Sequence, residues 1–184
     1  RQSPSWFKES SLKQLSENLL DRKPHQIGPR SAFIGIHWQN DVVASFGALS
    51  ETFAGSVEKR GLVPKTGALF GHARARGASV IYVNVVFEPA YVGLVRNNAL
   101  WNMVYKSKQF IRGTAGVEIV DGLKPREGDV VLEHTRISGF YETNLLGILI
   151  GRGIDSVYLT GVATNVAVDH TARDAAQYGF NTYV

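Results

Sequence analysis

The segment from residue 156 to residue 176 most constrains what this chain can fold into. It opens with the short apolar run S-V-Y-L-T, which is typical of a buried strand, and Gly161 follows directly. Beyond Gly161, with Thr164 or Asn165 expected as the helix cap, the apolar residues recur at the spacing of one helix face. These residues are Val168, Ala172, Ala175 and Ala176. A strand that runs into a helix N-terminus presents unpaired backbone N–H groups, so this stretch predicts a site for an anion or an oxyanion.

Other short apolar runs alternate with helical patterns along the chain. The runs lie at residues 32–36, 79–86, 130–132 and 181–184. The alternation predicts an α/β fold, a doubly wound three-layer sandwich with a mostly parallel sheet and ligands at the carboxyl ends of the strands.

Two connecting stretches differ in what the sequence predicts for them. Residues 44–61 are expected to form a polar loop that leads to a helix near Pro64, with Leu69, Phe70 and Ala73 in the core. Residues 87–112 are rich in aromatic residues but lack periodicity, which indicates a long loop with a helical piece that covers a pocket.

The ends of the chain are expected to differ from its middle. Residues 1–30 are interpreted as an N-terminal helical extension and linker, since the leucines of residues 12–20 share one face and Pro24 and Pro29 follow. Residues 31–184 form the main domain. A final strand with nothing beyond it would be an unprotected edge, so a C-terminal strand and helix are expected to be missing.

Composition excludes several classes of function. The net charge of +4 comes from basic residues spread along the chain, with no basic run interleaved with aromatic residues, so nucleic acid is not an expected partner. No apolar run reaches the length of a membrane span, so no membrane role is expected. The chain has no cysteine, which excludes disulfides and thiolate metal sites and favours a cytoplasmic location.

Three motifs together resemble the isochorismatase-like (cysteine amidohydrolase) superfamily. They are H-W-Q-N-D at 37–41, H-T-R-I-S-G-F at 134–140 and G-V-A-T-N-V-A-V-D-H-T-A-R-D-A at 161–175. The resemblance runs from about Ser31 to the end. The sequences at 96–100 and 125–132 are most similar to those of ureidoacrylate and related amide hydrolases. It implies a small-molecule substrate and a homo-oligomer.

The resemblance also assigns candidate catalytic positions. The family's aspartate, lysine and cysteine fall here at His37, His134 and Ala167, so the usual thiol chemistry is excluded. In the G-V-A-T turn the family commonly has a non-proline cis peptide that shapes an oxyanion hole. The resemblance therefore implies the backbone N–H groups of Ala163 and Ala167 as oxyanion donors.

The two histidines leave three interpretations open. Two imidazoles with a pKa near 6.5 can act as acid and base on a bound water. They can instead be two ligands of a divalent metal, the one cofactor left open, with a carboxylate as the third ligand. The candidate carboxylates are Asp41, Glu88 and Asp169. In the third interpretation, His37 and His134 make ordinary hydrogen bonds in a pocket that has lost its chemistry.

A further set of residues is expected to bind substrate or to surround the pocket. The substrate-binding candidates are Trp38, Asn40, Phe87, Trp101 and Phe140. Asn40 and Asp41 are also expected to hold their loop by local hydrogen bonds. His170 is expected either near the pocket or in solvent, and His25 and His72 in solvent. Arg173 and Asp174 are expected to pair or cap locally.

The favoured function is hydrolysis of an amide-like C–N bond or a vinyl ether, without a cysteine nucleophile. The main alternative is a catalytically inactive family member that binds a ligand or a partner subunit. The remaining alternative is a metal-dependent enzyme with another reaction.

Overall fold

The structure is a computed structural model that describes residues 26–184, so the N-terminal helix predicted within residues 12–20 and His25 lie outside the described residues. The strands are β1 (Ser31–Ile36), β2 (Ser79–Val85), β3 (Val130–His134), β4 (Ser156–Gly161) and β5 (Asn181–Tyr183). The helices are α2 (Asn40–Val43), α3 (Ser50–Lys59), α4 (Leu62–Ala75), α5 (Ala99–Lys106), α6 (Leu145–Gly151) and α7 (Asp169–Gln177). None of the helices of residues 26–184 is both long and apolar enough to cross a membrane.

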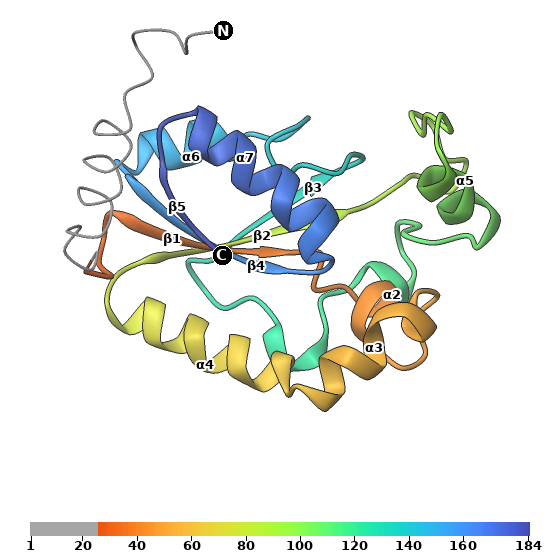
Figure 1. The fold of residues 1–184 in the computed structure, drawn as a ribbon, viewed down its shortest axis with the longest axis horizontal. Coiled ribbons are helices and arrows are strands. Elements are labelled where there is room, and N and C mark those ends of the chain that lie inside the picture. Colours follow the sequence, from red (N-terminus) through yellow and green to blue (C-terminus); the bar gives the residue numbers. More distant parts are fainter. Residues whose placement is uncertain (1–25) are drawn as a thin grey trace, which may run out of the picture.

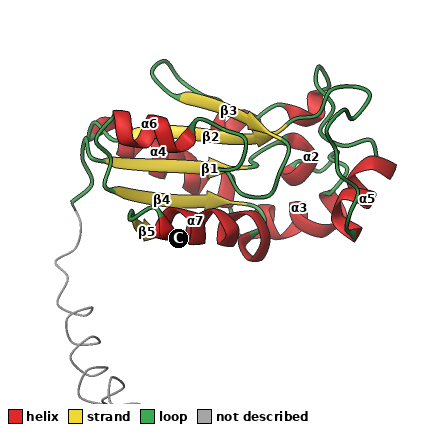
Figure 2. Ribbon diagram, turned by 90° about the horizontal axis from the view of Figure 1, so that it is seen from above, coloured by secondary structure: helices red, strands yellow, loops and turns green. Residues whose placement is uncertain are grey.

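The five strands form one parallel sheet in the order β3-β2-β1-β4-β5 (Figure 2). The chain winds from β1 out to β2 and β3 and then returns to the other side of β1 with β4 and β5. The strand order therefore reverses between β1 and β4, where open α/β sheets bind their ligands at the carboxyl ends. The predicted doubly wound α/β fold is confirmed.

Helices cover both faces of the sheet and complete the three layers (Figure 1). All six residues of β1 are buried, as expected for a central strand with no solvent-facing side. Side chains of a strand alternate between faces, so Phe33 packs with Phe70 of α4 while Ile34 packs with Leu145 of α6.

Two details of the sequence prediction were wrong. The expected polar loop at 44–61 instead contains α3, whose residues Ala54 and Val57 are buried in the core. Leu69 was expected in the core but is 39% exposed, whereas Phe70 and Ala73 are fully buried. The buried face of α4 follows Thr66, Phe70 and Ala73, and a helix turns Leu69 away from that face.

Candidate functional site

The carboxyl ends of β1 and β4 approach each other closely because of Gly161. A Cβ atom at Gly161 would lie 2.2 Å from the carbonyl oxygen of Ile36, so no other residue fits there. The next residue, Val162, donates its backbone N–H to the same Ile36 oxygen at 3.2 Å. This contact places the turn after β4 directly beside His37, the residue that follows β1.

The turn after β4 has the backbone that the sequence resemblance implied. The Val162–Ala163 peptide bond is cis. A π-helical turn (Thr164–Val168) then leads into α7, and the Ala163 carbonyl accepts hydrogen bonds from the backbone N–H groups of Val166 and Val168. The predicted cap at Thr164 or Asn165 was wrong, because neither helical segment has a side-chain cap there. Ala167 is 3% exposed within this turn.

His37 and His134 form a direct hydrogen bond between their side chains. The two Nε2 atoms are 2.9 Å apart, and both residues are buried. His37 has a positive φ of 53°, an uncommon backbone conformation for a residue other than glycine, and its N–H donates to the Val83 carbonyl. The fold therefore brings together the two histidines that lie 97 positions apart in the sequence.

The surrounding hydrogen bonds assign the protons of this pair. His134 Nδ1 lies 3.1 Å from the carbonyl oxygen of Ser138, and a carbonyl only accepts, so this nitrogen carries the hydrogen. In neutral His134 the Nε2 atom is then an acceptor. In the neutral pair His37 Nε2 then donates to it, which leaves Nδ1 without a hydrogen, whereas the backbone of Val162 favours a protonated His37 ring.

Both histidines favour the neutral form. Burial, followed by the electrostatic effect of His134, lowers the pKa of His37 well below its usual value, while the Val162 backbone acts in the opposite direction. Burial also lowers the pKa of His134 to about 4, although the Ser138 carbonyl and Glu142 raise it. The pair is therefore uncharged at neutral pH.

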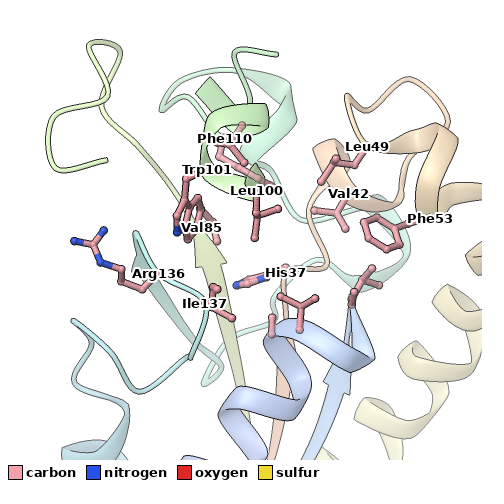
Figure 3. Close-up of a pocket in the computed structure, with 15 residues that line it drawn as sticks. His37, Val42, Leu49, Phe53, Val85, Leu100, Trp101, Phe110, Arg136 and Ile137 are labelled. Carbon is pink, nitrogen blue, oxygen red and sulfur yellow. The ribbon is translucent and has the colours of Figure 1, made fainter. Parts of the chain in front are cut away.

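A cavity of about 80 Å³ lies above His37, between the turn after β4 and helix α5 (Figure 3). Its lining is formed by His37, Val42, Leu49, Phe53, Val85, Leu100, Trp101, Val104, Phe110, Arg136, Ile137, Val162, Ala163, Val166 and Ala167. The cavity thus joins His37 to Ala167 and to both proposed oxyanion donors.

The Isochorismatase domain family model matches residues 31–184, which covers most of the chain and includes every element of this site. The chain belongs to the isochorismatase family. A ureidoacrylate amidohydrolase of Klebsiella pneumoniae is 32% identical over 157 residues, which cover 79% of this chain and 66% of that protein. The chain spans only about half the length of other curated relatives that it matches, 47% and 50% for two ureidoacrylate amidohydrolases.

Solved structures agree with this assignment. A cysteine hydrolase from Pseudomonas syringae matches with a TM-score of 0.76 and 27% identity, over 88% of this chain and 72% of that chain. An N-carbamoylsarcosine amidase from Thermoplasma acidophilum matches with a TM-score of 0.68 and 29% identity, over 83% and 79%. The parallel sheet with its flanking helices is therefore the isochorismatase-like architecture.

The Q-N-D part of this isochorismatase family member's first motif holds the roof of the cavity. The Gln39 side chain accepts from the Val85 N–H and donates to the Val85 carbonyl, so it pairs with the carboxyl end of β2. Asn40 donates to the Ala115 carbonyl, and Asp41 accepts from the Phe110 N–H at 2.7 Å. The hydrogen bonds of Asn40 and Asp41 were expected to be local, but they tie α2 to segments about 70 residues away.

The expected substrate-binding residues fall in different places. Trp101 lines the cavity, and Phe87 lies behind it with the two rings at 84° and 5.9 Å between centroids. Trp38 is buried in the core cluster on the α4 face. Phe140 stacks with Phe180 and contacts Tyr178 on the opposite face of the sheet, away from the cavity lining.

The remaining polar candidates lie outside the cavity lining. His72 is exposed, as expected, and His170 is exposed with its ring bonded to the Val166 carbonyl. Arg173 pairs with Asp169 one turn earlier in α7. The expected local role of Asp174 was wrong, because Asp174 instead accepts a short hydrogen bond from the Ser138 hydroxyl. Ser138 is also the residue whose carbonyl bonds to His134, so this contact joins α7 to the loop after β3.

A metal ion has no suitable ligand set in the part of the chain that the structure describes. No group of three or more His, Cys, Asp or Glu side chains within residues 26–184 could hold one. The three carboxylates that the sequence offered as a third ligand have other partners: the Phe110 N–H for Asp41, Arg112 for Glu88 and Arg173 for Asp169. His37 and His134 therefore do not form a metal centre with them.

A second, polar cavity of about 240 Å³ lies against the other side of the histidine pair. It is lined by His134 with Val86, Glu88, Val92, Arg112, Glu133, Thr135 and Glu142. Sequence reasoning missed both this cavity and most of the apolar lining of the first. Arg136 and Ile137 lie two and three positions after His134 in its motif, and that proximity was the one signal that could have indicated them.

Proposed function

We propose that this chain hydrolyses a small amide-like substrate by direct attack of water, with His37 and His134 as its acid–base pair. The observation that carries the proposal is the 2.9 Å bond between the two Nε2 atoms, with His37 on the lining of the same cavity as Ala167. The names of the matched relatives, ureidoacrylate amidohydrolase and N-carbamoylsarcosine amidase, favour a C–N bond over a vinyl ether.

The proton assignment gives the proton transfers to His37 and a supporting hydrogen bond to His134. His37 Nδ1, which carries no proton in the neutral pair, takes a proton from the attacking water as the water oxygen bonds to the substrate carbonyl carbon. The positive charge on His37 is stabilised by its Nε2–H bond to His134 and by the Val162 backbone. His37 then returns the proton to the leaving nitrogen as the C–N bond breaks.

The backbone of the turn after β4 supplies the second element of the proposal. The N–H groups of Ala163 and Ala167 are the proposed donors to the negative oxygen that forms on the substrate carbonyl. Backbone donors do not depend on side-chain identity, so this element is compatible with alanine at position 167. The lowered pKa values keep the histidines neutral at pH 7, which is the form a general base needs.

Release of ammonia or amine from a panel of small amides tests this function. Turnover should be unaffected by iodoacetamide, since the chain has no thiol, and by a metal chelator, since the described residues offer no ligand set. An acyl adduct on the protein, detected by mass spectrometry during turnover, would contradict direct attack by water.

A catalytically inactive ligand-binding protein is the second candidate, and one observation favours it. The two imidazoles satisfy each other's Nε2 atoms in a buried, uncharged pair that resembles a purely structural contact. In that case His37→Gln and His134→Gln should leave ligand affinity nearly unchanged, and no compound in the panel should be turned over.

A further inference from the structure

The cavity above His37 has an almost wholly apolar lining. Of the 15 residues that line it, only His37 and Arg136 carry ionisable side chains, and the others are aliphatic or aromatic. Hydroxyl, urea or carboxylate groups that enter such a space lose hydrogen bonds to water and find few replacements. The lining therefore selects against polar substrate groups.

Arg136 does not change this conclusion, because its guanidinium already has partners. Its Nη1 donates to the carbonyls of Thr135 at 3.0 Å and Gly93 at 3.2 Å, and its Nη2 lies 3.6 Å from a carboxylate oxygen of Glu142. Figure 3 shows this guanidinium pointing away from His37. These contacts thus hold the cation directed away from the position proposed for the amide.

The size of the cavity indicates which group it can enclose. Its volume of about 80 Å³ is roughly half that of an apolar cavity of about 150 Å³ that accommodates benzene. That space suits an apolar group of roughly three or four carbon atoms. The amide itself would lie at the edge of the cavity, where His37, Ala163 and Ala167 meet.

We infer that the site takes a neutral amide whose acyl group is short, branched and apolar, such as isobutyramide. This inference rests on the proposed function for the reaction. For the substrate class it rests on the apolar lining, the orientation of Arg136 away from His37 and the cavity volume. The acyl group lies among Leu49, Leu100 and Ile137, and the carbonyl faces the turn after β4.

A matched pair of amides tests the substrate class without requiring turnover. Isobutyramide and lactamide have the same shape, but lactamide replaces one methyl group by a hydroxyl. Binding measured by calorimetry or by saturation-transfer NMR should be at least about tenfold tighter for isobutyramide. N-carbamoylglycine, with a urea and a carboxylate, should bind more weakly than isobutyramide. Equal or tighter binding of lactamide or N-carbamoylglycine, or no binding of isobutyramide, would overturn the inference.

A cavity variant tests where the acyl group lies. Leu100 lines the roof from α5 and is only partly buried, so Leu100→Ala should fold while enlarging the cavity. The preference should shift toward 3-methylbutanamide relative to isobutyramide by about threefold or more. The control is Ile150→Ala, which removes a side chain that is 64% exposed on α6 and absent from the cavity lining, and should change neither affinity. An unchanged preference in a folded Leu100→Ala protein would overturn the placement.

The two measurements separate this inference from the proposed function. Selective binding of isobutyramide without any ammonia release would refute hydrolysis but support the substrate class as a ligand class. Ammonia release from polar amides, with no preference for isobutyramide, would refute the substrate class and leave hydrolysis in place.

Discussion

His37 and His134 hydrogen-bond to each other, yet each faces a different cavity. The cavity on the His37 side is small and apolar, and helix α5 covers it. The cavity on the His134 side is about three times larger and carries Glu88, Arg112, Glu133 and Glu142. The histidine pair thus lies between a small apolar cavity and a larger cavity lined by charged residues.

The contrast between the two cavities indicates what determines the pKa values of the two histidines. Burial is the largest cause of the lowered pKa of both histidines, and charged groups such as Glu142 and Arg136 modify only that of His134. On the polar side Arg112 is itself neutralised by ion pairs with Glu88 and Glu133. The apolar side should therefore control ligand choice, and the burial of the pair should control its protonation.

Acid should produce the largest effect. The folded pKa of His134, about 4, is below the unfolded value of about 6.5, so the folded state binds fewer protons between these values. The resulting contribution is fully retained above pH 6.5, and about 3 kcal/mol of unfolding free energy should be lost by pH 4. Urea unfolding at a series of pH values measures this loss. His134→Gln should reduce the dependence of the unfolding free energy on pH. No change on substitution would mean that His134 has the same pKa in the folded and unfolded states.

Removal of either imidazole should be nearly as damaging to the reaction. His37→Ala and His134→Ala should each lower kcat/KM by about 100-fold, and the double variant should lose far less than the product of the two losses. Steady-state rates of ammonia release give these values. His72→Ala, an exposed histidine on α4, is the matched control and should leave the rate unchanged. Multiplicative losses would show that the two histidines act separately.

Changes on the polar side should have little effect on ligand binding. Arg112→Gln removes the cation that joins Glu88 and Glu133, on the side of the pair opposite the apolar cavity. The dissociation constant for isobutyramide should change by less than about twofold, because sites without shared partners behave independently. Calorimetric titration of the variant measures it. A larger change would show that the two cavities are coupled through the pair.

The smallest effect is expected from restoring the thiol. Ala167→Cys places sulfur in the turn after β4, but the neighbouring histidines are neutral, so no cation is present to stabilise a thiolate. Amidase activity should remain within about twofold of the unsubstituted protein, and alkylation by iodoacetamide should be slow at pH 7. A gain of about tenfold or more would show that the pair can activate a thiol.

The sequence predicted the part of the site that depends on topology. His37 and His134 each follow or end a parallel strand, and the strand ends of one sheet meet at one edge, so their proximity was predictable. The cis peptide bond in the turn after β4 was predicted from the family resemblance. The contacts of the Q-N-D motif were not predictable, because Asn40 and Asp41 bond to segments that only the folded chain brings near.

The cavity lining was hidden for a related reason. Leu49 and Phe53 lie in a stretch that local composition indicated to be a polar loop. Leu49 is the N-cap residue of helix α3, Phe53 lies within that helix, and both line the cavity. Phe87 and Trp101 are aromatic residues of the same stretch and both belong to the buried core, yet only Trp101 also lines the cavity. Only packing distinguishes such residues, and packing has no local sequence pattern.

An uncharged histidine pair also determines how the site responds to dissolved salt. Mobile ions weaken the interaction of exposed charges over about 8–10 Å at ordinary ionic strength, but they have little to screen between two buried neutral rings. The bond between His37 and His134 should therefore persist in concentrated salt, while the exposed ion pairs of Arg112 weaken. The central contact of this site is thereby independent of the ionic strength of the surrounding solution.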